Sequence, residues 1–341
     1  MTSTEIAAAS KIMLGTTEAV AMYIGSVKMW PVGGGETPHD YSLDYFTIES
    51  LEDNNTIKMD KSKSPSNISL SYSTDNGETW TDLTISTSLN FATINTGDKI
   101  IFKGTNTRLA TAWDIYYRFN STKNFKAYGN AMSLLFGDNF ISNSEFTTGT
   151  INNLCGIFYG TTTIIDTSNL ILPALTCTQG CYNGMFRGCT NLTTAPKLPA
   201  THSAQDCYSS MFEGCINLEI APEINLVDMS QTCCQRMFCM SRTTKLTTPK
   251  MTKSPILSCK TGASNCYKEM FKGNGNLVEV TCLMTSLNGT SGWLANVSST
   301  GVFKKPSSVT GWQINDSGIP GNWTIEDYVE DSTKGQISKY V

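Results

Sequence analysis

The feature of this sequence that most constrains its fold is a repeat between about residues 154 and 283. One copy contains ten residues that recur, with the same amino acid, 26 positions later in the next copy. In the first of these two copies they are Cys181, Tyr182, Met185, Phe186, Gly188, Cys189, Asn191, Leu192, Ala195 and Pro196. Repeats of roughly 20 to 50 residues are typical of solenoids, in which each unit packs only against its neighbours. The sequence therefore predicts a stack of similar coils.

More divergent copies flank this pair. A third copy begins at Cys233, a fourth at Cys266, and a degenerate early copy at Cys155. We predict that the large apolar residues at equivalent positions form the repeat core. These residues are Phe158, Met185, Phe186, Leu192, Met211, Phe212, Leu218, Met237, Phe238, Met270, Phe271 and Leu277. If the coils stack in register, the phenylalanines of this set must line up in one column.

The residue types within a copy also predict its local structure. Gln205 and Asp206 before the segment 207–212 indicate an N-cap followed by one or two helical turns, which Gly214 would end. The alternating segment 192–198 predicts a short strand, and stacking of such strands would make a narrow parallel sheet. Because Pro196 and Pro222 lack a donor, the strand must be brief.

The pattern Cys-Tyr-x-x-Met-Phe-x-Gly-Cys-x-Asn-Leu-x-x-Ala-Pro occurs twice without a gap, from Cys181 and from Cys207. At these residues the chain resembles the BspA-type leucine-rich repeats of Bacteroides surface proteins and of phages that infect Bacteroides-like hosts. The resemblance covers about 130 residues of the repeat region. It implies a leucine-rich-repeat solenoid on a phage virion fibre or appendage. The later copies depart from the pattern at Cys239-Met240 and at Asn274, where we expect either capping or a local binding loop.

All 12 cysteines lie between Cys155 and Cys282, and their spacing follows the repeat. The simplest interpretation is that they are small buried hydrophobic residues stacked between coils. Disulfides remain an alternative if the protein matures outside a reducing compartment. A zinc site is disfavoured, because the cysteine spacing is irregular for a metal and only His202 is near. We therefore expect no cofactor and no metal.

The chain before the repeat divides by composition into three parts. Residues 1–30 predict a small β module that resembles N-terminal modules of phage fibre and tail-associated proteins, and its Tyr23, Ile24 and Trp30 are candidate residues for attachment to the virion or for oligomerisation. An ordinary hairpin is the alternative. Residues 31–40 are a linker rich in glycine.

Residues 41–128 predict a β-sandwich, because several segments alternate or are rich in β-branched and aromatic residues. Within it, the segment 73–80 matches the Asp-box, a hairpin element of sialidase-like propellers in which Asp and Ser bond the turn backbone. A single box does not make a propeller, and a sialidase-like enzyme is the least favoured hypothesis.

The solenoid is expected to span residues 129–283, with residues 129–146 capping its first coil. Residues 284–341 are expected to form a C-terminal cap and tail, and 317–324 resemble the tail that follows these repeats in the same phage and Bacteroides proteins. Trp293, Trp312 and Trp323 either plug the end of the core or form platforms for sugars, and the plug is favoured. The expected fold class is mainly β with short helices: a small N-terminal β module, a β-sandwich and a capped leucine-rich-repeat solenoid.

Charge and motif content narrow the possible functions. The net charge is −4 and no basic cluster is present, so nucleic acid is not an expected partner. Residues 1–11 lack the features of a secretory signal, and no apolar run approaches the ~20 residues that cross a bilayer, so membrane insertion is not expected. No phosphate-binding loop is present, and for the two histidines, His39 in the linker and His202 in a loop between repeats, a solvated side chain is the default interpretation. Nothing in the sequence argues for an enzyme.

Together these observations predict a non-enzymatic structural protein on the surface of a phage virion, assembled in the host cytoplasm. It would be a head or tail fibre or appendage that displays the repeat solenoid for adhesion to the host or to surface glycans. The expected partners are other virion proteins, further copies of the chain with a trimer favoured, and a host receptor or glycan. The alternative is a secreted bacterial surface adhesin or glycan-binding module.

Overall fold

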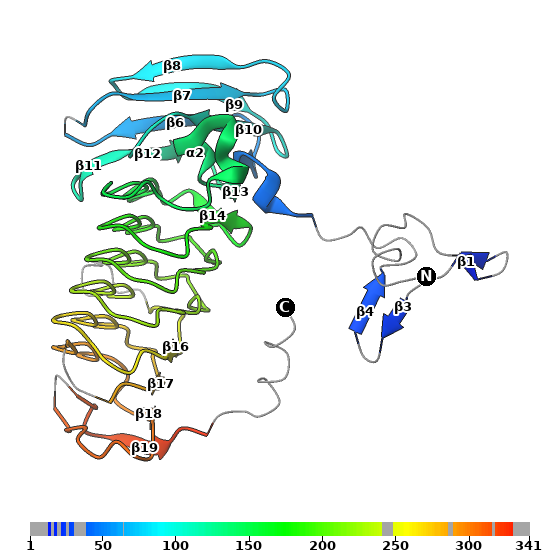
Figure 1. The fold of residues 1–341 in the computed structure, drawn as a ribbon. Helices are drawn as coiled ribbons and strands as arrows, with labels where there is room; N and C mark the ends of the chain where they lie inside the picture. Colours follow the sequence, from blue (N-terminus) through cyan, green and yellow to red (C-terminus); the bar gives the residue numbers. More distant parts are fainter. Residues whose placement is uncertain are drawn as a thin grey trace. The chain divides into compact units, whose positions relative to one another are not determined.

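The computed structural model describes residues 39–63, 65–240, 248–285, 289–315 and 318–329, with the backbone of four short strands before them. The chain is divided into two compact units, Met1–Asp40 and Tyr41–Val341. In the first unit, β1 (Met13–Leu14) pairs antiparallel with β2 (Thr17–Glu18), and β3 (Met22–Ile24) pairs antiparallel with β4 (Val27–Trp30). The second unit is mainly β, and its described part contains one short α-helix (Figure 1).

Two sheets form the first part of the second unit. One has the strand order β14-β13-β5-β10-β7-β8, with β15 also beside β13, and the other has the order β11-β12-β6-β9. Their bounds are β5 Phe46–Ser50, β6 Asn55–Lys61, β7 Ile68–Ser73, β8 Thr81–Ile85, β9 Leu89–Ile94, β10 Lys99–Gly104, β11 Ala110–Ala112, β12 Ile115–Ser121, β13 Phe125–Asn130, β14 Ile164–Asp166 and β15 Leu170–Ile171. In β6 every second side chain from Asn55 to Met59 is buried. This alternation is that of a strand with one face on the core.

Aromatic rings from both sheets fill the space between them. Phe119 of β12 lies with its ring centre 4.9 Å from both Phe46 of β5 and Phe102 of β10, and Phe91 of β9 lies 4.9 Å from Phe102. These four side chains are buried. The two sheets therefore pack face to face around one apolar core.

The hairpin between β7 and β8 has the bonds expected of an Asp-box. The Ser73 hydroxyl donates to Asp75 at 2.6 Å, and Asp75 accepts from both the N–H and the hydroxyl of Thr79 at 2.9 and 2.5 Å. These bonds, with that of Ser73 first, lower the pKa of Asp75 to about 2. The box is thus a turn-forming element in this protein.

The repeat region contains turns where the sequence predicted helical turns. Left-handed residues recur at every fourth position of a coil, as at Asp206, Ser210 and Gly214 with φ of 58°, 55° and 80°. A left-handed residue interrupts an α-helix. The prediction of helical turns at 207–212 is therefore wrong, and each coil instead runs through a series of successive turns.

Hydrogen bonds between coils explain why this turn series is stable. The N–H groups of Tyr182 and Phe186 donate to the carbonyls of Cys207 and Met211 in the next coil, at 3.0 and 2.9 Å. The N–H of Met185, between them, donates to Tyr182 three residues back at 3.2 Å. Main-chain N–H groups thus donate alternately to the next coil and to the residue three positions back in the same coil. All of these N–H groups therefore have an acceptor only when the coils are stacked.

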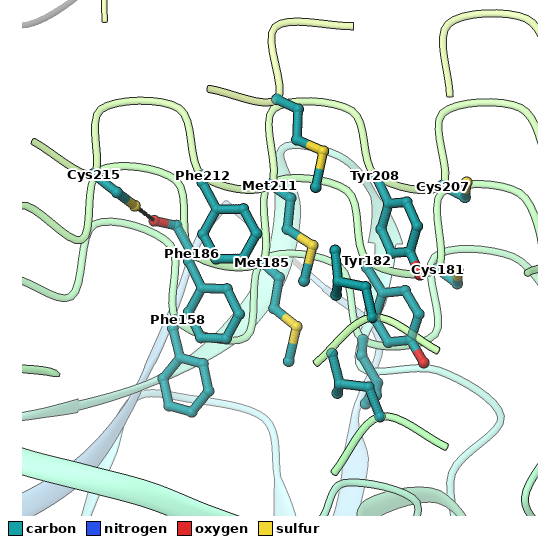
Figure 2. Packing of buried hydrophobic residues seen from close by; sticks show 14 of the residues in the cluster. Phe158, Cys181, Tyr182, Met185, Phe186, Cys207, Tyr208, Met211, Phe212 and Cys215 are labelled. Carbon is teal, nitrogen blue, oxygen red and sulfur yellow. Dashed lines mark hydrogen bonds between the residues drawn. The ribbon is translucent and has the colours of Figure 1, made fainter. Parts of the chain in front are cut away.

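The coils stack in register, and their side chains form columns (Figure 2). The rings of Phe158, Phe186, Phe212, Phe238 and Phe271 follow one another at 5.4 to 5.7 Å and 4° to 9° between planes. Tyr182 and Tyr208 form a second column at 5.7 Å, and Met185 and Met211 lie between the two columns in Figure 2. The predicted phenylalanine column is confirmed, and this part of the chain is a β-solenoid.

The sandwich and the solenoid share one continuous core. Phe158 of the first coil lies 6.0 Å from Phe46 and 6.2 Å from Phe119 of the sandwich, and the N–H of Phe119 donates to Ile157 of that coil at 2.8 Å. Strand β13 also pairs in parallel with β14. The strands β12 and β13 therefore cover the first coil.

Residues 129–146, which we expected to cap the first coil, lie elsewhere for the most part. The helix α2 (Ser133–Phe136) and the 3-10 helix η2 (Gly137–Ser142) lie beside β10 of the sandwich. The Ser133 hydroxyl accepts from the N–H of Phe46 and donates to Phe102, both at 2.9 Å. Only Phe146 reaches a column, with its ring 5.4 Å from that of Tyr182.

At the other end of the solenoid, four parallel strands follow one another along one side: β16 (Lys253–Leu257), β17 (Glu279–Cys282), β18 (Gly301–Lys305) and β19 (Trp323–Asp327). Trp293, Trp312 and Trp323 are buried there, and Trp293 stacks on Trp312 at 5.5 Å. The tryptophans thus close the core, as the favoured interpretation of the sequence held.

Candidate functional site

The predicted repeat-core residues are buried, with exposed fractions of 1% or less, and all belong to the main hydrophobic cluster. They hold the coils together and do not meet solvent. Tyr23 and Ile24 lie in β3 and Trp30 in β4, but their side chains lie outside the part of the structure that is described. Their role in attachment stays a prediction.

All 12 cysteines are buried, and none is joined to another in a disulfide. Cys189 and Cys215 donate to the carbonyls of Phe158 and Phe186 at 3.0 and 3.1 Å, so that each bond joins a thiol to the preceding coil. Figure 2 shows the bond of Cys215. Burial raises the pKa of Cys155 and of Cys282 to about 12. A thiol that stays protonated is a poor nucleophile and a poor metal ligand, so these cysteines serve packing.

A groove of about 780 Å³ lies on the solenoid surface between two successive Ala-Pro segments. Residues 193–199 of one coil and 219–223 of the next form most of its walls. Ala195, Pro196, Ala221 and Pro222 give it an apolar floor, and Ile220 at its rim is 81% exposed. Such a hollow, apolar inside and polar at its edge, is the usual form of a binding site.

The main chain along this groove leaves polar groups unpaired between the two coils. Among the described residues, no main-chain hydrogen bond joins 195–200 to 219–226, and the side chain of Asn225 bridges to Leu198 instead at 3.3 Å. Thr194 makes only a single parallel bridge, to Asp166. The predicted strand 192–198 is therefore absent, because Pro196 and Pro199 interrupt the donors that a ladder needs.

Charged side chains surround the groove on both coils. Glu219 pairs with Lys250 of the following coil at 3.1 Å, and Lys197 and Glu223 are exposed at its edge. Both signs are present, so the groove offers donors and acceptors without a dominant charge. The repeated Ala-Pro was visible in the sequence, but it was interpreted as a strand and not as the wall of a groove.

A second charged feature runs along a different side of the coils and is structural. Glu213, with its side chain 2% exposed, accepts from Arg187 of the coil before at 3.3 Å and from Arg236 of the coil after at 2.9 Å. Arg236 continues to Glu269, which also binds Lys272 at 2.6 Å. Five charges of alternating sign therefore join four successive coils. Sequence reasoning missed this ion ladder. Arg187 and Glu213 lie 26 residues apart at equivalent repeat positions, and Arg236 and Glu269 lie 33 residues apart at another, so the repeat spacing could have indicated both pairs.

His202 has a partner, but the pair is exposed. Its Nδ1 lies 3.1 Å from Asp228, and the N–H of Ser203 donates to the same carboxylate at 2.6 Å. Partial burial acts to raise the pKa of Asp228, but these bonds outweigh it and lower that pKa. The hydroxyl of Ser203 accepts from the N–H of Ser230 at 2.6 Å and has no bond to His202 in the structure. The three residues therefore do not form a nucleophile–base relay.

In the part of the chain that is described, no three or more His, Cys, Asp or Glu side chains are grouped so as to hold a metal ion. None of the described helices has the length and apolar character needed to cross a bilayer. Comparison with protein-family models, with curated proteins and with solved structures found no match for this chain.

Proposed function

We propose that this chain is a non-enzymatic structural protein of a phage virion, a head or tail fibre or appendage that displays a leucine-rich-repeat solenoid of the BspA type for adhesion to host or surface glycans. The observation that carries the proposal is the groove between segments 193–199 and 219–225, held on a stack of coils whose interior is tightly packed. The side chains of the repeat with reactive chemistry, its thiols, are buried away from the groove. We therefore assign ligand binding to the groove on the surface, and the packed interior keeps the groove in a fixed shape.

The packing supports display because it fixes the surface at small entropic cost to a ligand. Each coil bonds to the next through its main chain and stacks rings at 5.4 to 5.7 Å. A site that does not have to order itself on binding loses less free energy to conformational entropy. Symmetric copies on a particle would then multiply weak contacts into firm attachment, which is why we propose a homo-oligomer, with a trimer favoured, bound to other virion proteins.

The experiment compares two arginine substitutions on the same coil. Ile220→Arg places a charge at the groove rim, whereas Val227→Arg places the same charge on a side chain that is 66% exposed and outside the groove. Purified wild-type chain, labelled and mixed with host cells, should bind. The Ile220 variant should lose most of that binding and the Val227 variant should keep it. Equal binding by all three proteins would contradict adhesion through the groove.

The location on the particle is tested separately, by imaging virions that carry a label on this chain. We expect the label at a head or tail fibre in a small symmetric set. Its absence from particles, together with export of the chain to a bacterial surface, would instead support the alternative of a secreted adhesin. Because the proposed protein is not an enzyme, incubation of the chain with a glycan to which it binds should release no free sugar.

A further inference from the structure

A second hollow lies on the sandwich, far in sequence from the groove of the solenoid. It has a volume of about 450 Å³ and is lined by residues of β7, β8 and β10 and of the turn at η2. We call it the sandwich recess. Gly104 and Gly137 are among its lining residues. A Cβ at Gly104 would lie 2.5 Å from the carbonyl oxygen of Ser69, so the close approach of β10 to β7 there requires glycine.

The polar groups of the recess fall into two sets, of which the first is already engaged. Lys103 binds both oxygens of Asp138 at 2.9 and 3.0 Å and lies 4.1 Å from the ring centre of Trp80. Asp138 also accepts from the hydroxyl of Tyr45 at 2.7 Å. The bond from Lys103 foremost, and then that from Tyr45, lowers the pKa of Asp138. This wall is therefore a fixed, charge-balanced unit.

The second set faces the recess with hydrogen-bonding capacity to spare. Within the described residues, the hydroxyls of Ser69, Thr84 and Thr105 and the side-chain amide of Asn139 make no hydrogen bond to protein. One oxygen of Asp82 binds the Ser71 hydroxyl at 2.5 Å, and the other is available. Hydroxyls, an amide and a carboxylate oxygen at one place supply both donors and acceptors.

Charge and shape select among possible ligands. With Asp138 neutralised by Lys103, the remaining charge is that of Asp82, which repels anions such as phosphate or an acidic sugar. A metal cation is not favoured either, because most carboxylate oxygens here are engaged and no metal-binding group occurs in the described part of the chain. Phe136 adds a partly buried aromatic wall. A neutral polyhydroxylated ring, with hydroxyls around an apolar face, matches this lining.

We propose that the sandwich recess binds one neutral hexose or N-acetylhexosamine unit of a glycan. The proposal rests on the proposed function for its ligand class and adds a second contact point on a different part of the chain. Two weak sites on one rigid unit would hold a long glycan more firmly than either alone.

The test uses two tyrosine substitutions on β8. Thr84→Tyr fills the recess, whereas Thr81→Tyr adds the same side chain to an exposed position of the same strand that does not line it. Wild-type chain is titrated by calorimetry with D-glucose, D-galactose, D-mannose, N-acetyl-D-glucosamine and, as the anionic comparison, N-acetylneuraminic acid. At least one neutral sugar should bind. The Thr84 variant should bind it about tenfold more weakly or worse, and the Thr81 variant should match wild type.

Three results would overturn the assignment: no neutral sugar binds, only the acidic sugar binds, or the Thr84 variant binds as wild type does. These results are distinct from failure of the proposed function, which is measured by cell adhesion of the Ile220 and Val227 variants. If Thr84→Tyr has no effect while Ile220→Arg abolishes adhesion, the recess assignment fails and the groove stands. If wild-type chain does not adhere to cells at all, the proposed function fails whatever the sugars do.

Discussion

The sandwich and the solenoid of this chain build the same kind of core in opposite ways. In the sandwich, β12 pairs with β6 across some 60 residues of sequence, and the rings of Phe46, Phe91, Phe102 and Phe119 meet at angles from 29° to 71°. In the solenoid, each coil contacts the coil about one repeat away, and the rings of the phenylalanine column lie within 9° of parallel. The sandwich thus depends on all its strands at once, whereas a coil depends on two neighbours.

The two regions also differ in chemistry. The solenoid contains all 12 cysteines of the chain, and the sandwich strands β5 to β13 contain none. The solenoid also has an ion ladder across four coils, while the ion pairs of the sandwich, such as Lys126–Glu49, join neighbouring strands. Conditions or substitutions that act on the thiols or on the ion ladder should therefore destabilise the solenoid more than the sandwich.

The largest expected effect is that of alkaline pH. Burial raises the pKa of Cys155, Cys266 and Cys282 to about 12, whereas an unfolded thiol has a pKa of about 8.5. The stabilising contribution of such a thiol is therefore complete below about pH 8.5 and is lost as the pH rises toward 12, by on the order of 1 kcal/mol per pH unit for each thiol. Hydrogen exchange under reducing conditions at rising pH should show the solenoid opening before the sandwich.

A matched variant checks the source of that effect. Cys282→Ala removes one of these thiols from the core, so its stability should fall less steeply with pH than that of wild type. A slope unchanged by the substitution, or a sandwich that opens first, would contradict a role for the buried thiols.

The next effect in size is that of Phe212→Ala. The ring is fully buried and lies between Phe186 at 5.4 Å and Phe238 at 5.6 Å, so its removal opens a cavity inside the column. We expect the free energy of unfolding of the solenoid to fall by about 3–5 kcal/mol. Urea unfolding of the variant measures the loss, with Phe102→Ala as the sandwich counterpart. A loss below about 1 kcal/mol would mean that the columns contribute little.

A smaller loss is expected from Glu213→Gln. The substitution keeps the shape of the side chain but removes the charge shared by Arg187 and Arg236. We expect a cost of about 3 kcal/mol, at the low end of the range for a broken buried ion pair, because both arginines retain some exposure. Unfolding at low and at high salt provides the measurement, and Glu219→Gln, at an exposed pair with Lys250, is the control with a cost of about 1 kcal/mol or less.

Much of the solenoid could be predicted from the sequence, because its main contacts join equivalent residues of neighbouring repeats. Residues 26 positions apart must meet if coils stack, so the column of Phe186, Phe212 and Phe238 followed from spacing alone. The turn series did not follow, because positions such as Ser210 adopt a left-handed conformation that their residue type rarely adopts. Their neighbours need the carbonyls of the next coil, which a single copy does not reveal.

The surface sites were harder to predict than the core. The groove depends on how two Ala-Pro segments lie side by side without pairing, and the sandwich recess depends on Asp138 meeting Lys103 from 35 residues away. The contact of Asp138 with Lys103 has no period, so no pattern in the sequence marks it. The Ala-Pro segments do recur with the repeat, but their spacing does not show that they lie side by side without pairing. The buried role of the cysteines was predictable, because their spacing followed that of the aromatic core.

Hydrogen exchange of Phe212→Ala and Phe102→Ala, resolved along the chain by mass spectrometry, tests the contrast between the two regions most directly. The account predicts that Phe212→Ala loses protection mainly in residues 178–240 and leaves residues 46–125 as in wild type, whereas Phe102→Ala loses protection throughout 46–125. Loss of protection spread evenly over both regions in both variants would contradict it.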